Sequence, residues 1–158
     1  MARLTVLGML ALLALSGCSL TVQPDWRTAD DVVAMLKGAG LPIGLTISYT
    51  AESDPDRLLG TPGGYTSRVD FQDTRLPILG SDRPDLQSGG SVEFFPNRAD
   101  MWRRAEAIRK RYESGAIPIE YQHRFYNVLV RLTFALTPEQ RADYDRVLSE
   151  YSRALKGR

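Results

Sequence analysis

The sequence predicts a single α+β domain in which a mostly antiparallel sheet of about five strands packs against helices on one of its faces. Segments with an apolar residue at every second position are typical of half-buried strands. These strand segments and the segments with helical periodicity follow one another along the chain in the order α-β-β-β-α-β-β-α. Several strands therefore succeed one another directly, unlike the strand–helix alternation of a doubly wound parallel sheet. The 158 residues are enough for one hydrophobic core and require no second one.

The first helix is expected to start after Thr28, whose hydroxyl makes it a preferred N-cap residue. Asp30 and Asp31 follow in the first turn, where the positive end of the helix dipole favours negative charge. Gly38 and Gly40 are expected to end the helix, because glycine readily takes the left-handed backbone conformation found after helix ends.

Two strands are expected to follow this helix. In the first, Leu45, Ile47 and Tyr49 alternate with polar residues, which indicates that one face is buried. The second spans residues 65–72 and is expected to place its polar residues, Asp70 among them, on the solvent side.

The connections around the second strand are rich in turn-forming residues. Asp54 is expected to cap a helical turn that has Pro55 at its first position and is closed by Gly60. Residues 74–90 contain two prolines and three glycines, so they are expected to form a long loop before a third strand over residues 91–95.

A long helix is expected after Asn97, which is an N-cap residue. Gly115 and Pro118 are expected to end it. Its apolar residues fall on one stripe at i, i+4, i+7 and i+11, namely Met101, Ala105, Ile108 and Tyr112.

Residues 119–134 are expected to form a β-hairpin with its turn near Tyr126-Asn127, because asparagine tolerates the left-handed conformation. A capping box with proline at the first helical position then predicts the start of the final helix, in the segment Thr137-Pro138-Glu139-Gln140. That helix places four apolar residues on a single face, Tyr144, Leu148, Tyr151 and Leu155.

Residues 1–17 are typical of an export signal peptide. Arg3 gives a positive start, Leu4–Leu15 form an apolar run of 12 residues, and Ser16 and Gly17 suit a cleavage region. The run is shorter than the roughly 20 residues that a membrane-spanning helix needs. We therefore expect the mature protein to begin at Cys18.

Cys18 is the only cysteine of the chain and lies where bacterial lipoproteins carry their lipid. Leu15-Ser16-Gly17-Cys18 matches the lipobox, so we expect a diacylglyceryl group on Cys18 and cleavage by signal peptidase II between Gly17 and Cys18. Two acyl chains anchor a protein stably, at roughly 0.8 kcal/mol per buried methylene. The predicted location is the extracytoplasmic face of the cell membrane, or an outer membrane where the cell has one. An ordinary secreted protein with a chance cysteine is the alternative.

Residues 18–28 show no periodicity and are expected to be a tether of at most about 35 Å between the lipid and the domain. The folded domain is expected to comprise residues 29–158. Because its sequence offers no disulfide and no histidine-based zinc site, we expect it to fold by its hydrophobic core alone.

The charge balance argues against a nucleic-acid partner. Arg3 is the only charged residue before Cys18, which leaves 19 basic and 19 acidic side chains in the mature part. Nucleic-acid binding requires a concentrated positive field, and this composition does not provide one in bulk.

Five short segments of the mature part are informative as motifs: Tyr49-Thr50-Ala51-Glu52, Leu58-Leu59-Gly60-Thr61-Pro62, Tyr65-Thr66-Ser67, Gly89-Gly90-Ser91-Val92-Glu93 and Leu136-Thr137-Pro138-Glu139-Gln140. Together they resemble a group of small uncharacterised lipoproteins and secreted proteins of bacteria, many of them high-GC Gram-positive organisms. The resemblance covers most of residues 29–155. It implies one exported domain and no particular activity.

The sequence assigns no catalytic residue, metal site or cofactor. His123, the only histidine, shares a strand face with Tyr121 and Phe125 and is expected to pack there as a structural residue. Four aspartates could be imagined as a calcium site, but their spacing lacks the regular loop that gathers six or more oxygens: Asp54, Asp56, Asp70 and Asp73. No Gly-x-Ser-x-Gly or Ser-x-x-Lys motif indicates a nucleophile.

The long helix carries the densest positive charge of the chain. Arg103, Arg104, Lys110 and Arg111 are expected to lie opposite its apolar stripe. The favoured interpretation is a solvated helix face. The functional hypothesis for these four cations is contact with an anionic surface, which can be lipid headgroups, a wall polymer or an acidic partner.

We expect the domain to be a non-enzymatic binding or accessory module of the cell envelope, held at the membrane through Cys18, with an unknown protein or polymer partner. An envelope hydrolase whose acidic residues converge only in the fold is the alternative. A deep pocket that gathers two or three acids with His123 favours the hydrolase, whereas a shallow surface rich in tyrosine favours binding.

Overall fold

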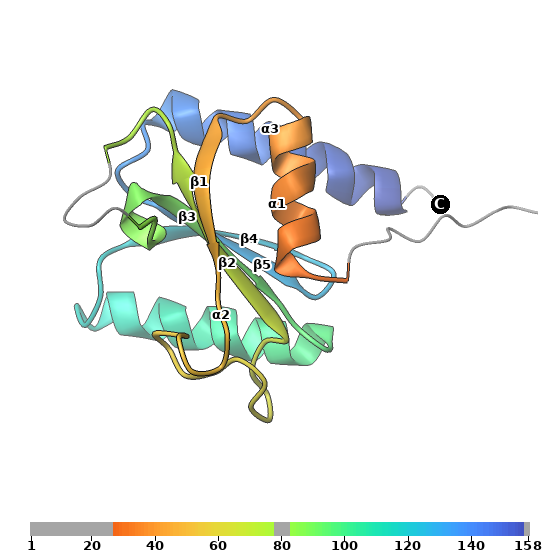
Figure 1. The fold of residues 1–158 in the computed structure, drawn as a ribbon, viewed down its shortest axis with the longest axis vertical. Coiled ribbons are helices and arrows are strands. Elements are labelled where there is room, and N and C mark those ends of the chain that lie inside the picture. The colour runs from red at the N-terminus through yellow and green to blue at the C-terminus, as the bar shows by residue number, and fades with distance from the viewer. Residues whose placement is uncertain (1–26, 78–82, 157–158) are drawn as a thin grey trace, which may run out of the picture.

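The computed structural model describes residues 27–77 and 83–156. Its elements are α1 (Ala29–Gly38), β1 (Ile43–Ser48), β2 (Ser67–Asp73), the 3-10 helix η1 (Leu86–Ser88), β3 (Gly89–Phe94), α2 (Arg98–Glu113), β4 (Glu120–Phe125), β5 (Val128–Thr133) and α3 (Pro138–Lys156). This order confirms the predicted α+β domain (Figure 1). The signal peptide 1–17, Cys18, the tether up to residue 26 and the Leu155 side chain lie outside the described residues.

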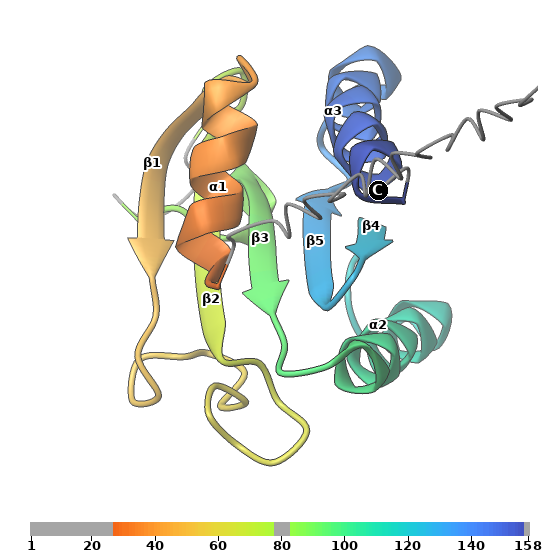
Figure 2. The same cartoon turned by 90° about the vertical axis from the view of Figure 1, so that its right-hand side faces the viewer.

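The five strands form one antiparallel sheet in the order β1-β2-β3-β5-β4. Val92 in β3 faces Val69 in β2 on one side and Val130 in β5 on the other, which sets the register of the central strands. The edge strands β1 and β4 lie at opposite ends of the row in Figure 2. The predicted antiparallel sheet is therefore confirmed.

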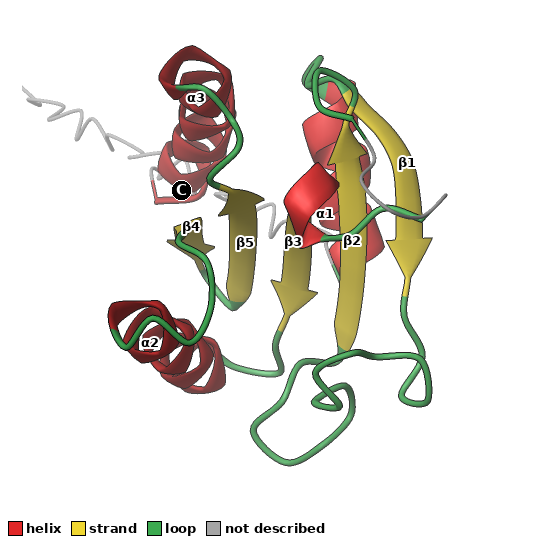
Figure 3. Cartoon of the chain, turned by 90° about the vertical axis from the view of Figure 1, so that its left-hand side faces the viewer, coloured by secondary structure: helices red, strands yellow, loops and turns green. Residues whose placement is uncertain are grey.

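Helices cover both faces of the sheet, so the expectation that they share one face is wrong. α1 and α3 pack on the face that includes Phe71, Val92 and Val130, whereas α2 packs on the opposite face against Leu129. η1 lies on the side of the sheet opposite α1, as Figure 3 shows. The physical reason is that Val128-Leu129-Val130 in β5 is apolar on both faces, and such a strand requires cover on both sides.

The larger apolar cluster fills the space between the sheet, α1 and α3. Leu36 of α1 and Tyr144 and Leu148 of α3 are buried in it, and the rings of Phe71 and Tyr144 stack with centroids 6.0 Å apart. The smaller cluster joins α2 to β5 and to the loop between β1 and β2. All side chains assigned to the two clusters lie within residues 29–151.

The predicted helix starts are confirmed. The Thr28 hydroxyl accepts the Asp31 N–H at 3.2 Å, and the Asp31 carboxylate accepts the Thr28 N–H at 2.9 Å, which forms a capping box at α1. Asn97 caps α2. Thr137 and Gln140 form a second reciprocal box at the start of α3.

Two predictions about turns are wrong in detail. Tyr126, with φ of 51°, takes the positive φ in the β4–β5 turn, while Asn127 donates its side-chain amide to the Phe95 carbonyl. The segment after Asp54 forms successive turns rather than a helical turn, although the Asp54 carboxylate does accept the Leu58 N–H at 2.7 Å.

β1 also differs from the prediction. A bulge interrupts its pairing with β2 between Ile43 and Thr46, and Leu45 is left 52% exposed. Because a bulge shifts the alternation of side chains between faces, the simple alternating pattern does not hold here. None of the helices in the described ranges is long and apolar enough to cross a membrane.

Candidate functional site

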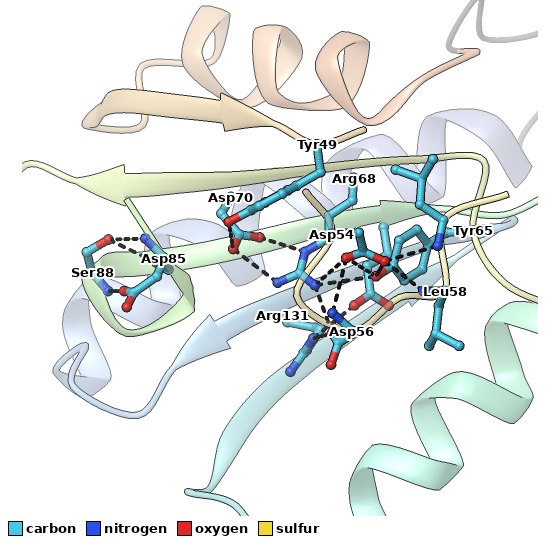
Figure 4. Close-up of polar contacts among 12 residues, drawn as sticks. Tyr49, Asp54, Asp56, Leu58, Tyr65, Arg68, Asp70, Asp85, Ser88 and Arg131 are labelled. Atoms are coloured by element: carbon cyan, nitrogen blue, oxygen red, sulfur yellow. Dashed lines mark hydrogen bonds and ion pairs between the residues drawn. The ribbon is translucent and has the colours of Figure 1, made fainter. Parts of the chain in front are cut away.

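The sheet face beneath α2 carries buried charged residues, although the sequence predicted that this face is exposed to solvent. Five carboxylates and three guanidinium groups meet there, and Figure 4 shows much of this network. We call these eight residues the ionic cluster: Asp54, Asp56, Arg68, Asp70, Glu93, Arg104, Glu120 and Arg131. Six of the eight are buried, Asp56 and Arg104 being the exceptions.

Arg68 of β2 organises one half of the ionic cluster. Its Nη1 lies 3.2 Å from Asp54 Oδ1 and 2.8 Å from Asp56 Oδ2, and its Nε lies 3.0 Å from Asp70 Oδ1. The Tyr65 hydroxyl donates to Asp54 at 2.7 Å. The loop between β1 and β2 is thereby tied to the middle of the sheet.

Glu93 of β3 organises the other half and is fully buried between two arginines. Its Oε1 lies 2.9 Å from Arg131 Nη1 and 3.0 Å from Arg104 Nη2. Arg131 Nη2 also lies 2.7 Å from Glu120 Oε2. Arg104 Nη2 lies 2.6 Å from Asp56 Oδ2, which links the two halves.

The arginines keep the clustered carboxylates ionised. Burial by itself would raise the pKa of Glu93, but the charges of Arg131 and Arg104 outweigh it, and the pKa is lowered. The pKa of Asp56 is lowered against burial in the same way, chiefly by Arg104. A general acid requires the opposite shift, toward the working pH. Among the described buried side-chain polar atoms only Ser91 Oγ lacks a partner, so the ionic cluster is a closed, satisfied network.

Asp70 and Arg104 were expected at the surface, and both expectations are wrong. Asp70 is 1% exposed, and the Arg104 side chain is 10% exposed. Arg104 follows Met101 by three residues and precedes Ile108 by four, so it borders the apolar stripe rather than lying opposite it. Asp70 faces the layer that the loop and η1 cover, not solvent.

The other three of the four cations predicted to face an anionic surface are exposed as expected. Arg103 is 68% exposed and forms an ion pair with Asp100. Lys110 and Arg111 lie near the C-terminal end of the helix. Of the four residues proposed for contact with an anionic surface, Arg104 is therefore held away from such a surface in the ionic cluster.

The aspartates considered for calcium do not share one site. Asp54, Asp56 and Asp70 converge on Arg68, whereas Asp73 lies on the opposite face and accepts the Tyr144 hydroxyl at 2.9 Å. Over residues 27–77 and 83–156, no group of three or more histidine, cysteine, aspartate or glutamate side chains is arranged to hold a metal ion.

His123 lies on the face of β4 that is turned toward α3, with Tyr121 and Phe125 as predicted. Its Nε2 lies 2.6 Å from Asp145 Oδ1. Burial lowers the pKa of the imidazole even though the Asp145 carboxylate favours its charged form. The sheet separates His123 from the ionic cluster, so the acids and the histidine do not share a pocket.

An open groove of about 490 Å³ lies where the start of α2, the β4–β5 turn and the end of α3 meet. We call it the aromatic–arginine groove. Its lining residues are Asn97, Arg98, Met101, Trp102, Arg124, Phe125, Tyr126, Asn127 and Ser152. A volume of a few hundred Å³ is typical of small-molecule sites.

The groove combines exposed aromatic rings with arginines. Trp102 is 41% exposed and Tyr126 is 45% exposed. The Arg124 guanidinium lies 4.2 Å from the centroid of the Trp102 ring, which is a cation–π contact. The buried side chains of Met101 and Phe125 supply an apolar floor.

A second hollow of about 410 Å³ adjoins the groove and shares Arg124, Phe125 and Ser152 with it. It adds Arg153 to the lining. No carboxylate among the described residues lines either hollow or forms an ion pair with Arg98, Arg124 or Arg153. This surface is therefore cationic over an apolar floor.

Sequence reasoning did not find the groove, because its residues come from three segments far apart in the chain. One local signal was present. Trp102 follows the buried Met101 on α2 and so falls outside the apolar stripe, at a position where a polar residue is expected. A large aromatic ring at such a position indicates a contact surface.

Comparisons with known proteins give no indication of the function of this chain. No protein-family model, curated protein or solved structure matches the chain. The fold, the ionic cluster and the aromatic–arginine groove are the observations from which a function can be derived.

Proposed function

We propose that the protein is a cell-envelope lipoprotein whose folded domain binds an anionic amphiphile in the aromatic–arginine groove. By an anionic amphiphile we mean a molecule with a negative headgroup and an apolar part. One observation carries the binding function: Arg98, Arg124 and Arg153, which have no carboxylate partner among the described residues, surround a floor of aromatic and apolar side chains.

Each part of the groove suits one part of such a ligand. A guanidinium group can bind a carboxylate or a phosphate with two parallel hydrogen bonds. The rings of Trp102 and Tyr126 offer large apolar faces and lose little conformational entropy on binding. Because no described carboxylate lines the groove or forms an ion pair with these arginines, an incoming anion does not have to displace one.

The membrane anchor is argued from the sequence. The segment Leu15-Ser16-Gly17-Cys18 supports the proposal of a diacylglyceryl group on Cys18, and it predicts that the domain lies on the extracytoplasmic face of the membrane. The first helix begins at Ala29, so only a short tether separates the lipid from the folded domain.

The geometry favours binding over the alternative of an envelope hydrolase. The acids do converge, but they do so in the closed ionic cluster, where arginines lower the pKa of Glu93 and Asp56. His123 and Ser149 line the same hollow, yet no hydrogen bond between described atoms joins them. A serine nucleophile requires such a bond to its general base.

The binding function is tested with the chain that begins at Ser19, in which both apolar clusters are intact. Trp26→Phe leaves Trp102 as the only tryptophan. Monomeric short-chain phosphatidylglycerol is titrated while the emission of Trp102 is followed. We expect a saturable change. Arg124→Gln should weaken binding at least about tenfold, because a hydrogen bond to a charged group contributes about 1.5–3 kcal/mol.

Lys110→Gln is the matched control, since it removes one exposed charge of α2 outside the groove. Thermal unfolding shows that each variant is folded. Equal affinities of the parent and Arg124→Gln would refute the groove as the site. Mass spectrometry of the protein from its native membrane tests the anchor independently, and an unmodified Cys18 or a different mature N-terminus would refute it.

A further inference from the structure

We infer that the aromatic–arginine groove docks on the membrane to which the chain is anchored, and that its occupant is the headgroup of an anionic phospholipid in that bilayer. This inference rests on the proposed function, since it names the ligand of the same groove. It also assigns an orientation: the domain lies with the groove against the bilayer rather than projecting away from it.

The start of the folded domain and the groove lie at the same end of the sheet. The Ala29 N–H donates to Ser67 Oγ at 2.6 Å, and Ser67 begins β2. Ser67 pairs with Phe94, Phe94 pairs with Val128, and Val128 pairs with Phe125, which lines the groove. Figure 2 shows the dark-orange start of α1 and the β4–β5 turn at this common end.

The tether length fits this orientation. Three strand spacings separate β2 from β4, which is about 14 Å. Residues 18–28 reach at most about 35 Å. If the opposite end of the sheet faced the membrane, the tether would first have to cross the length of the sheet. A strand of six residues makes that extra path about 20 Å long. The groove end is therefore the end of the sheet that a lipid on Cys18 reaches by the shorter path.

The groove has the composition of a membrane-interface surface. Tryptophan and tyrosine prefer the headgroup level of a bilayer, where one part of the ring system is apolar and the other is hydrated. Arginine can lay its apolar stem along the acyl region and keep its charge at the phosphates. Each cation near an anionic membrane strengthens partitioning about fivefold. Arg98 and Arg124 supply two such charges beside Trp102 and Tyr126.

Four other cations of α2 provide a comparison within the same helix. Arg104 is held in the ionic cluster, and Arg103 is paired with Asp100. Lys110 and Arg111 are exposed, lie at the far end of the helix and do not line the groove. Removing Lys110 and Arg111 changes the net charge as much as removing Arg98 and Arg124, but it leaves the groove intact.

The test measures sedimentation of the chain from Ser19 with sucrose-loaded vesicles at low salt. Vesicles contain either phosphatidylglycerol mixed with phosphatidylcholine or phosphatidylcholine alone. The parent should partition to the anionic vesicles, and binding should fade as salt shortens the screening length to about 8 Å. Arg98→Gln/Arg124→Gln should reduce partitioning about 25-fold. Lys110→Gln/Arg111→Gln should keep it within about twofold of the parent.

Orientation is read from Trp102 in the Trp26→Phe background. Brominated phosphatidylglycerol should quench its emission in the parent and in the Lys110→Gln/Arg111→Gln variant, but not in the groove variant. Three results would overturn the inference. The parent could partition equally to neutral vesicles, the two double variants could lose partitioning equally, or only the Lys110→Gln/Arg111→Gln variant could lose it. Binding of monomeric phosphatidylglycerol without vesicle binding overturns membrane docking alone. Failure of both overturns the proposed function as well.

Discussion

Arg104 joins the two halves of the ionic cluster through contacts with Asp56 and Glu93. Moving a guanidinium group out of water costs several kcal/mol, and only close carboxylates offset that cost. The positive charge of Arg104 also helps to keep Glu93 ionised without contact with solvent. At the scale of single residues, the cluster therefore depends on complete pairing: each charge is stable where it is because the others are present.

Arg104→Ala should lower the free energy of unfolding by about 3 kcal/mol, because it removes one partner of a buried charge network. Urea unfolding of the variant measures this change. Arg103→Ala is the neighbouring control: its side chain is 68% exposed, so its ion pair should contribute no more than about 0.5 kcal/mol. Similar midpoints for Arg104→Ala and Arg103→Ala would contradict the assignment of Arg104 to the cluster.

At the scale of elements, α2 is an amphipathic helix with two kinds of inner contact. Met101, Ala105 and Ile108 are each 1% exposed and form the predicted apolar stripe. Arg104 lies beside that stripe and enters the ionic cluster. The helix thereby covers the second face of the sheet through a narrow row of apolar contacts, the seam between α2 and β5, with the charged Arg104 beside it. Its N-terminal end contributes Trp102 to the groove.

Ile108→Ala should lower the free energy of unfolding by about 2–5 kcal/mol, through lost transfer energy and the cavity that remains. Chemical denaturation measures the loss. Arg111→Ala on the same helix should change it by less than about 0.5 kcal/mol, because the side chain is exposed and has no partner among the described residues. A loss of less than about 1 kcal/mol for Ile108→Ala would mean that the seam between α2 and β5 is loosely packed.

At the scale of the whole molecule, the sheet separates an apolar layer from a largely ionic one. α1 and α3 complete the apolar layer, while α2 and the loop between β1 and β2 enclose the ionic cluster. The two layers respond differently to solution conditions, since apolar burial does not depend on pH whereas the ionic layer does.

Stability should therefore fall in acid. The pKa values of Asp54, Asp56, Asp73 and Glu93 are lowered in the folded protein, so the unfolded chain takes up protons first. Their contribution is complete above the ordinary carboxyl pKa of about 4 and is lost as the pH falls through the folded values.

Urea midpoints between neutral pH and pH of about 2 measure this decline, which should be steep only below pH of about 4. A shallower decline from pH of about 6.5 is expected from His123, whose pKa is also lowered by burial, so that the unfolded state binds its proton first. In the Asp54→Asn variant the urea midpoint should fall less steeply below pH of about 4. A midpoint that stays constant down to pH of about 2.5 would contradict the ionised state of the cluster.

The ionic cluster and the groove were only partly accessible to prediction. The alternation of β2 placed Arg68 and Asp70 on one face correctly, but a polar face was equated with a solvent face. A sequence signal does exist. In the register of the sheet Arg68 pairs with Glu93, so two opposite charges face each other on neighbouring strands. That signal becomes readable only when the pairing of strands is known.

Local sequence signals were sufficient to predict the helices and strands and their order. Caps, glycines and apolar periodicity act over a few residues, so they can be interpreted without the rest of the chain. The prediction of the lipid anchor likewise rests on the sequence, because it depends on a contiguous motif at Cys18. Three features became visible only in the folded chain: helices cover both faces of the sheet, Arg104 is held in the ionic cluster, and residues of three separate segments meet in one groove. These features arise from contacts between segments distant in the sequence, and such contacts are set by strand pairing and helix docking rather than by local propensity.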